Sequence, residues 1–206
     1  MRQLSRLVVS ALLGLAVFSS PASAAWMGAD GKRLPFKNDQ EVLDFLSEAA
    51  IVERQELSEG INKPTKLTLE RKGVRAHAIL RLVEKEHNDP NNASPQARRF
   101  RDSYVFELAA YEMARMLGLD NVPPVVLRTV DGHRGSVQLW VENAMSEAKR
   151  IESKTAPKDL GRWQHQRQVM LFFDNLIYNF DRNHGNMLLD KQGKLWFVDH
   201  TRSFSR

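Results

Sequence analysis

Asn179 to His200 is the stretch that decides the fold, and it reads NFDRNHGNMLLDKQGKLWFVDH. A polar loop opens it, and two short apolar runs, MLL and LWFV, follow on either side of a KQGK turn. Short apolar runs around a glycine-containing turn predict a β-hairpin. Because a hairpin folds back on itself, Asn186 at its start and Asp199 just beyond its end are expected to lie close together near Asp181.

The expected cluster of Asp181, Asn186 and Asp199 consists of oxygen-bearing side chains. Phosphoryl transfer needs one carboxylate to orient the attacking hydroxyl, and oxygen ligands for the magnesium ions that neutralise the phosphates. The spacing Asp-x4-Asn, followed by a hairpin and an Asp, is that of the protein-kinase catalytic loop and metal aspartate. A purely structural alternative assigns Asp181 and Asn186 to the capping of turns and Asp199 to closure of the hairpin.

The remaining sequence predicts an antiparallel sheet with one helix, followed by a helical region, which is an α+β arrangement. Apolar periodicity marks the helices, and Asp131-Gly132 is a strong hairpin signal between two of the strands. The expected strands cover 51–57, 66–70, 76–83, 122–130 and 135–141, and the expected helices follow Asn38-Asp39 and cover 101–117 and 159–180.

A second stretch, from Glu107 to Arg128, reads ELAAYEMARMLGLDNVPPVVLR. It resembles the αC helix and following strand of the secretory-pathway Golgi kinases, the casein kinase and glycan-xylose kinase group. The D-R-N-x-G-N and G-K-L-W-F-V-D-H motifs are also similar to those of phosphatidylinositol 3- and 4-kinase-like catalytic domains. The resemblance covers most of residues 51–204 and implies an atypical protein-kinase-like fold with two lobes, ATP, and Mg2+ or Mn2+.

The resemblance also implies roles for individual residues. Asp181 would be the catalytic base or would orient the acceptor hydroxyl, with Asn186 beside it in the catalytic loop. Asn186 and Asp199 would hold the metal ions. Glu107 would be the αC glutamate, which pairs with the nucleotide-binding lysine or helps to bind metal.

The sequence departs from the family pattern at the nucleotide site. Arg81 stands at the position where a kinase normally has a lysine, and its planar guanidinium does not place one compact charge between the phosphates. Lys66, on the preceding strand, could substitute for that lysine if it points inward. Gly60 is a lone glycine where a kinase normally carries a glycine-rich loop.

The family pattern also continues beyond the point that this sequence reaches. Protein-kinase-like folds normally follow the metal aspartate with an activation segment and several helices of the second lobe. Here seven residues follow Asp199. The resemblance therefore predicts a C-terminally truncated chain.

The N-terminal residues predict export from the cytoplasm. Arg2 and Arg6 precede an apolar run, and Ala22-Ser23-Ala24 supplies the small residues of a signal-peptide cleavage site. An uncleaved membrane anchor is the alternative, although the run is shorter than the ~20 residues of a bilayer span. Removal of residues 1–24 leaves no expected transmembrane span and lowers the formal charge from +5 to +3, because both arginines leave with the peptide.

Composition excludes several other classes of protein. Apolar residues make up 42% and charged residues 27% of the 206, so the chain can bury a core and is not disordered by composition. Cysteine is absent, which excludes disulfides, iron–sulfur clusters and thiol catalysis. No basic stripe with interleaved aromatic residues is present, which argues against a nucleic-acid partner.

The sequence therefore predicts an exported, periplasmic or extracellular kinase (of the secretory pathway if the host is eukaryotic), which transfers the ATP γ-phosphate to a protein or glycan hydroxyl. A lipid kinase of the phosphatidylinositol type and an inactive pseudokinase that serves as a binding module remain open as alternatives. The expected organisation is a signal peptide (1–24), an extension with a short helix (25–50), a kinase-like N-lobe (51–142), a linker (143–158), and the start of a C-lobe with the catalytic loop and metal-binding hairpin (159–206).

Overall fold

A computed structural model describes residues 26–57, 64–94 and 98–204 of the chain. The predicted signal peptide and Gly60 lie outside the described residues. Within the described ranges, no helix is both long and apolar enough to cross a membrane.

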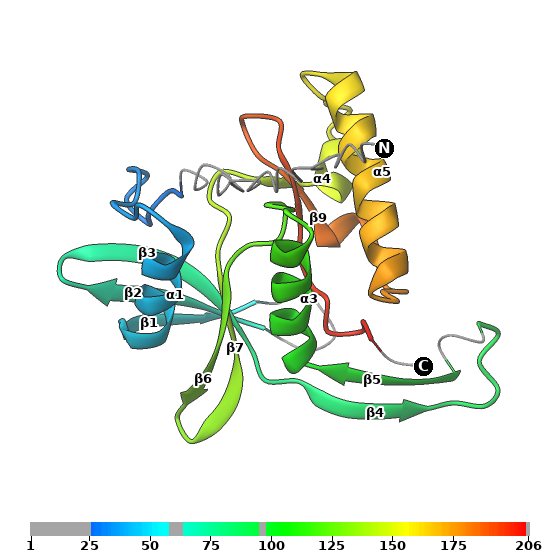
Figure 1. Ribbon diagram of the computed structural model, residues 1–206, viewed down its shortest axis with the longest axis horizontal. Coiled ribbons are helices and arrows are strands. Elements are labelled where there is room, and N and C mark those ends of the chain that lie inside the picture. Colours follow the sequence, from blue (N-terminus) through cyan, green and yellow to red (C-terminus); the bar gives the residue numbers. More distant parts are fainter. Residues whose placement is uncertain (1–25, 58–63, 95–97, 205–206) are drawn as a thin grey trace, which may run out of the picture.

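A five-stranded antiparallel sheet forms the first half of the fold, with the strand order β1-β2-β3-β7-β6 (Figure 1). Its β6–β7 hairpin turns at Asp131 and Gly132, whose φ angles of +52° and +82° are the left-handed values that tight hairpin turns require. The predicted hairpin at this dipeptide is therefore confirmed. The strands are β1 (Ala50–Glu56), β2 (Thr65–Arg71), β3 (Val74–Arg81), β6 (Val125–Val130) and β7 (His133–Leu139).

Helix α1 (Asp39–Glu48) packs on one face of this sheet. Asn38 caps it, because the side chain of Asn38 accepts a hydrogen bond from the backbone N–H of Glu41 at 3.0 Å. The buried face of the helix shares a core with alternate residues of the sheet, which are Leu67, Leu69, Ala76, Ala78, Leu80, Val137 and Leu139.

A second core joins helix α3 (Val105–Met116) to helix α5 (Leu160–Leu176) and to the hairpin of β9 (Met187–Leu189) and β10 (Leu195–Phe197). The short 3-10 turn η1 (His184–Asn186) leads into β9. The hairpin predicted from the MLL and LWFV runs is confirmed, with Leu188 opposite Trp196.

Strand β10 connects the two cores because its side chains alternate between them. Leu195 and Phe197 belong to the core of α3 and α5. Trp196 belongs to the sheet core, where its ring lies 4.8 Å from that of Trp26. The strand that precedes Asp199 is thereby fixed from both sides.

The main differences from the sequence prediction concern three segments, while several expected strand limits shift by two or three residues. Residues 101–103, expected in a helix, instead belong to β5 (Arg99–Ser103), which pairs with β4 (Glu84–Asn88) in a separate hairpin. The expected linker contains β8 (Met145–Ser146) and α4 (Glu147–Glu152). Helix α5 ends at Leu176 rather than at 180, because Ile177 and the residues after it turn into the polar loop.

Candidate active site

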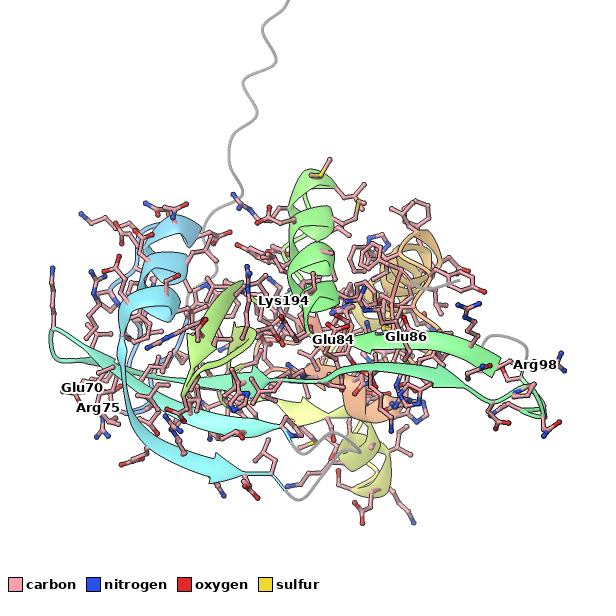
Figure 2. All side chains as sticks on the ribbon, turned by 90° about the horizontal axis from the view of Figure 1, so that it is seen from below. Glu70, Arg75, Glu84, Glu86, Arg98 and Lys194 are labelled. Atoms are coloured by element: carbon pink, nitrogen blue, oxygen red, sulfur yellow. The ribbon has the colours of Figure 1, made fainter. Side chains whose placement is uncertain are left out.

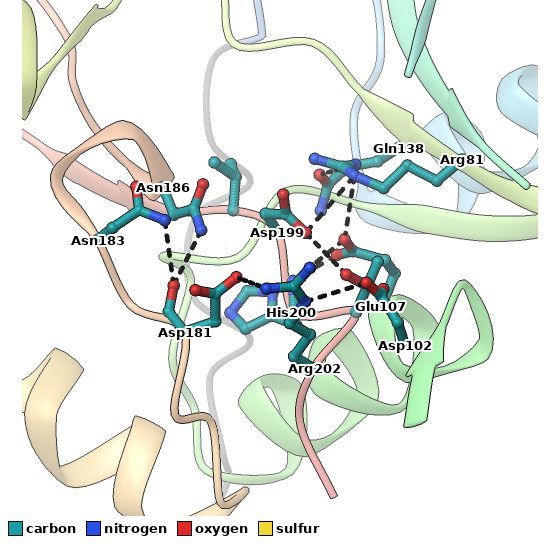
Figure 3. A network of polar contacts seen from close by, with 12 residues as sticks. Arg81, Asp102, Glu107, Gln138, Asp181, Asn183, Asn186, Asp199, His200 and Arg202 are labelled. Carbon is teal, nitrogen blue, oxygen red and sulfur yellow. Dashed lines mark hydrogen bonds and ion pairs between the residues drawn. The ribbon is translucent and has the colours of Figure 1, made fainter. Parts of the chain in front are cut away.

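Strand β3 brings Arg81 to the junction of the two halves of the fold. Its guanidinium is nearly buried; Nε lies 3.3 Å from Oε1 of Glu107, and Nη1 donates to Oε1 of Gln138 at 3.3 Å (Figure 3). Among the described residues, Nη2 of Arg81 donates no hydrogen bond. The arginine therefore occupies the place where the sequence predicted a nucleotide-binding cation, and it is held there by two neighbours.

Glu107, in the first turn of α3, is fully buried. Its Oε1 accepts a hydrogen bond from the backbone N–H of His200 at 3.1 Å, and Nδ1 of His200 lies 3.5 Å from its Oε2. Burial by itself would raise the pKa of Glu107, but the Arg81 charge and the His200 contacts outweigh burial and hold that pKa at about 2. Glu107 is therefore an ionised buried partner of Arg81, not the solvated charge that a lone helix Glu usually is.

Asp199 is a second carboxylate near Arg81, in addition to Glu107. Its Oδ1 lies 3.9 Å from Nε of Arg81 and accepts a hydrogen bond from the Thr201 hydroxyl at 3.1 Å. The side chain is 39% exposed, so an oxygen of the carboxylate can reach a ligand. The backbone of Asp199 has a φ of +59°, a left-handed conformation that few non-glycine residues adopt and that Asp adopts more readily than most.

The loop after α5 is held by an arginine to which the sequence analysis assigned no role. Arg182 forms a fork to Asp174 of α5, with Nε–Oδ2 and Nη2–Oδ1 distances of 2.9 Å each. Its Nη1 also donates to the backbone carbonyls of Asn186 and Val198, at 2.7 and 2.6 Å. One side chain thus ties the helix to both ends of the β9–β10 hairpin.

Asp181 and Asn186 lie side by side within this loop. The Asn186 amide Nδ2 donates to the backbone carbonyl of Asp181 at 3.1 Å, and the amide oxygen accepts no hydrogen bond from the described residues. The Asp181 side chain is 38% exposed. Burial raises the pKa of Asp181, and the nearby Arg202 guanidinium opposes that rise.

Lys66 is placed differently from the other predicted residues. Its ammonium lies over the ring of Trp140, 4.7 Å from the ring centre. Among the described residues, no hydrogen bond or ion pair connects Lys66 to Arg81, Glu107 or Asp199. The structure therefore brings Arg81, Glu107 and Asp199 into direct contact, places Asp181 beside Asn186, and leaves the role of Lys66 a prediction.

The side chains of the site suit a nucleotide with a hard divalent cation. Asn186 and Asp199 offer an amide and a carboxylate oxygen, which magnesium accepts, and Mg2+ commonly takes only one or two protein ligands beside phosphates and waters. In the parts of the chain that the structure describes, no group of three or more His, Cys, Asp or Glu residues gathers as a metal cage. Gln138 Nε2 is buried beside Arg81 without a hydrogen-bond partner among the described residues.

Two further residues of the site were missed by the sequence analysis, Arg202 and Asp102. Arg202 lies 3.2 Å from Asp181, between Nη1 and Oδ2, and donates from Nε to Oδ2 of Asp102 at 3.0 Å. Arg202 could have been suspected of a role in the site, because it follows the predicted metal ligand Asp199 by three residues. Asp102 gave none, because the stretch that contains it was assigned to a helix.

Comparison with protein-family models and with curated proteins gives no match. Solved structures do match in fold. A structure of hydra Fam20 with sugar superposes with a TM-score of 0.57 at 17% sequence identity, over 80% of this chain and 66% of that one. A crystal structure of the Golgi casein kinase superposes with a TM-score of 0.54 at 14% identity, over 82% of this chain and 57% of that one.

These similarities establish a kinase-like fold and confirm the predicted fold class, an antiparallel sheet lobe joined to a helical region. The chain spans less than two thirds of the length of either matched structure.

Proposed function

We propose that the protein is an atypical kinase that transfers the γ-phosphate of ATP to a hydroxyl group of a protein or glycan. The observation that carries this proposal is the contact of Arg81 with both Glu107 and Asp199 on a kinase-like fold. These three residues come from a strand, a helix and a loop that are far apart in the sequence. Glu107 is completely buried where these three residues meet, whereas charges that lie together by chance are found at the surface.

The proposed division of labour follows from the exposure of each group. Asp181, partly exposed, accepts the hydrogen bond of the acceptor hydroxyl and orients it for attack. Asn186 and Asp199 hold the divalent cation, which neutralises phosphate charge when it is bound. Arg81 presents its third nitrogen, Nη2, to the phosphates while Glu107 and Gln138 fix the other two.

We also propose that the protein acts outside the cytoplasm. The N-terminal residues predict a signal peptide, and the matched structures include one described as a Golgi kinase. A protein or glycan acceptor is consistent with this location, and the hydra Fam20 structure is described as containing sugar. The phosphatidylinositol kinase-like motif makes lipid hydroxyls the third acceptor class to assay.

A pseudokinase is the competing function, and Arg81 is the observation that favours it. In that case the protein binds nucleotide, or a partner, without turnover. Arg81 replaces the lysine of active kinases and is already engaged by Glu107 and Gln138.

The test combines thermal unfolding with ATP consumption. The mature protein is measured with ATP and Mg2+ or Mn2+, alongside Asp199→Asn and Asp199→Ala, and Arg54→Gln serves as a control that removes a surface ion pair with Asp131. We expect nucleotide to stabilise the wild type and the control, both of which consume ATP, and the Asp199 variants to lose turnover. Stabilisation without turnover supports the pseudokinase, and absence of both effects refutes the nucleotide site.

A further inference from the structure

Arg202 bridges two carboxylates that belong to different parts of the fold. Its Nε donates to Oδ2 of Asp102 at 3.0 Å, and its Nη1 lies 3.2 Å from Oδ2 of Asp181 (Figure 3). Asp102 is fully buried and Arg202 is 16% exposed. A planar guanidinium that contacts a carboxylate on each of two edges has little freedom to rotate.

The anchor of this bridge is the β4–β5 hairpin, which is inserted between β3 and α3. Figure 2 shows the hairpin extending away from the rest of the fold, with Glu84, Glu86 and Arg98 along it. The base of the hairpin, not its tip, faces the active site. There the backbone N–H of Ser103 donates to the carbonyl of Thr201 at 2.8 Å, which fixes the chain next to Arg202.

Arg202 is also held by an aromatic ring. The guanidinium carbon of Arg202 lies 5.1 Å from the ring centre of Phe100 on β5. The Phe100 ring in turn meets Phe180, the residue before Asp181, edge to face at 5.1 Å. Cation–π and edge-to-face contacts of this kind add to the orientation of both partners.

We propose that Arg202 is a positioning residue, which holds the carboxylate of Asp181 in place through its own anchorage on Asp102. This inference rests on the proposed kinase function. Arg202 engages Oδ2 of Asp181, and Oδ1 accepts no hydrogen bond from the described residues. Oδ1 is therefore left to accept the hydrogen bond of the acceptor hydroxyl, while Arg202 prevents the side chain from rotating away.

Holding the carboxylate matters because little else in the structure constrains it. The contacts from Asn186 and Asn183 reach the backbone carbonyl of Asp181, not its carboxylate. A displacement of about 1 Å in a group that orients a reactant can cost about 100-fold in rate. The loop contacts thus fix the backbone of Asp181, and Arg202 fixes its carboxylate.

The experiment measures kcat, the KM for ATP and nucleotide affinity for Arg202→Gln, Arg202→Lys and Asp102→Asn in the mature protein. We expect Arg202→Gln to lower kcat by about 100-fold, with nucleotide affinity unchanged, because the ion pairs of Arg202 among the described residues go to Asp102 and Asp181 and not to Asp199. Arg202→Lys retains one of the two pairs and should recover part of the loss. Arg54→Gln is the matched control for removal of a guanidinium.

A double-mutant cycle with Asp181→Asn separates positioning from general damage to the fold. If Arg202 acts through Asp181, then Arg202→Gln lowers kcat much less in the Asp181→Asn background than in the wild type. Activities are normalised to nucleotide-binding sites, so that a partly unfolded sample does not imitate the effect. If Arg202→Gln does not fold, Arg202→Lys and Asp102→Asn replace it in the cycle.

The outcomes distinguish this inference from the proposed function. A wild type that consumes no ATP refutes the kinase proposal and the role of Arg202 with it. A wild type that turns over ATP, with Arg202→Gln at an unchanged kcat, overturns the positioning role alone. Equal losses with and without Asp181 also overturn it, because they show that Arg202 acts independently of that carboxylate.

Discussion

Arg182 and Asp174 form a two-pronged ion pair between the loop that carries Asp181 and the end of helix α5. Both side chains are buried, and the same guanidinium donates to the carbonyls of Asn186 and Val198. This single arginine therefore positions both ends of the hairpin that separates the two predicted metal ligands.

Arg182→Met should destabilise the whole protein. The substitution removes four hydrogen bonds and leaves the carboxylate of Asp174 buried without its partner, which typically costs about 3–5 kcal/mol. Denaturant unfolding of the two proteins measures the difference. Arg54→Met, which removes an exposed pair with Asp131, should cost far less stability. Equal effects of the two substitutions would contradict the structural role of Arg182.

Glu107→Gln should alter how stability depends on pH in acid. The pKa of Glu107 is about 2 in the folded protein, below its ordinary value of 4.5. A lowered carboxyl pKa contributes stability above pH 4.5, and this contribution is lost as the pH falls from 4.5 towards 2, because the unfolded chain takes up the proton first. The free energy of unfolding, measured by denaturant between pH 6 and pH 3, should therefore fall less steeply in Glu107→Gln.

The same pH series needs a control for the other carboxylates. Glu48→Gln removes a carboxylate that pairs with Arg71 at the surface, and it should leave the slope close to that of the wild type. A Glu107→Gln protein whose slope in acid equals that of the wild type would show that Glu107 is not held ionised by Arg81.

Arg81→Lys should reduce turnover, although it restores the usual kinase residue. Glu107 and Gln138 are spaced for the guanidinium, and a lysine cannot contact both and also extend towards the nucleotide. We expect a loss of about tenfold in kcat/KM for ATP, corresponding to one hydrogen bond to a charged group. A gain of turnover would instead mean that the site functions better with lysine and that Arg81 has weakened it.

Lys66→Met tests whether the second predicted cation binds nucleotide. Lys66 lies over Trp140 and, among the described residues, forms no ion pair with Glu107 or Asp199. We expect nucleotide affinity, measured by calorimetry, to change less than about threefold, and Arg81→Met to reduce it far more. If the two substitutions weaken binding equally, Lys66 takes part in binding the phosphates.

Removal of divalent cations should abolish the stabilisation by ATP but not the fold. Backbone contacts of the loop and Arg81 position Asn186 and Asp199. Chelation should therefore leave the melting temperature without nucleotide unchanged and remove the shift that ATP produces. A large drop in the melting temperature of the nucleotide-free protein after chelation would point to a structural metal instead.

The sequence could predict the elements whose apolar pattern is regular. The MLL and LWFV runs gave the β9–β10 hairpin, and Asp131-Gly132 gave the turn of β6–β7. The pairing of Arg81 with Glu107 was also within reach, because both positions could be matched to a family pattern before any contact was known.

The β4–β5 hairpin could not be predicted in this way. Its strands read EKEHN and RFRDS, so charged residues occupy both faces and no alternation of period two remains. The hairpin is stabilised by long-range contacts of Phe100, Asp102 and Ser103 instead. The roles of Arg182 and Arg202 were hidden for a related reason: an arginine in a polar loop is normally solvated, and only the tertiary fold shows what it contacts.

Helix α3 is part of the same core as α5, because Ala110, Tyr111 and Ala114 pack with Met170 and other residues of that core. Moving Glu107 away from Arg81 by displacing α3 would therefore expose apolar side chains that belong to both halves of the fold. Amide hydrogens of α3 and α5 should exchange with solvent in one cooperative opening, not in two. The carboxylate that faces Arg81 is therefore carried by a helix whose displacement would disrupt the core of the fold.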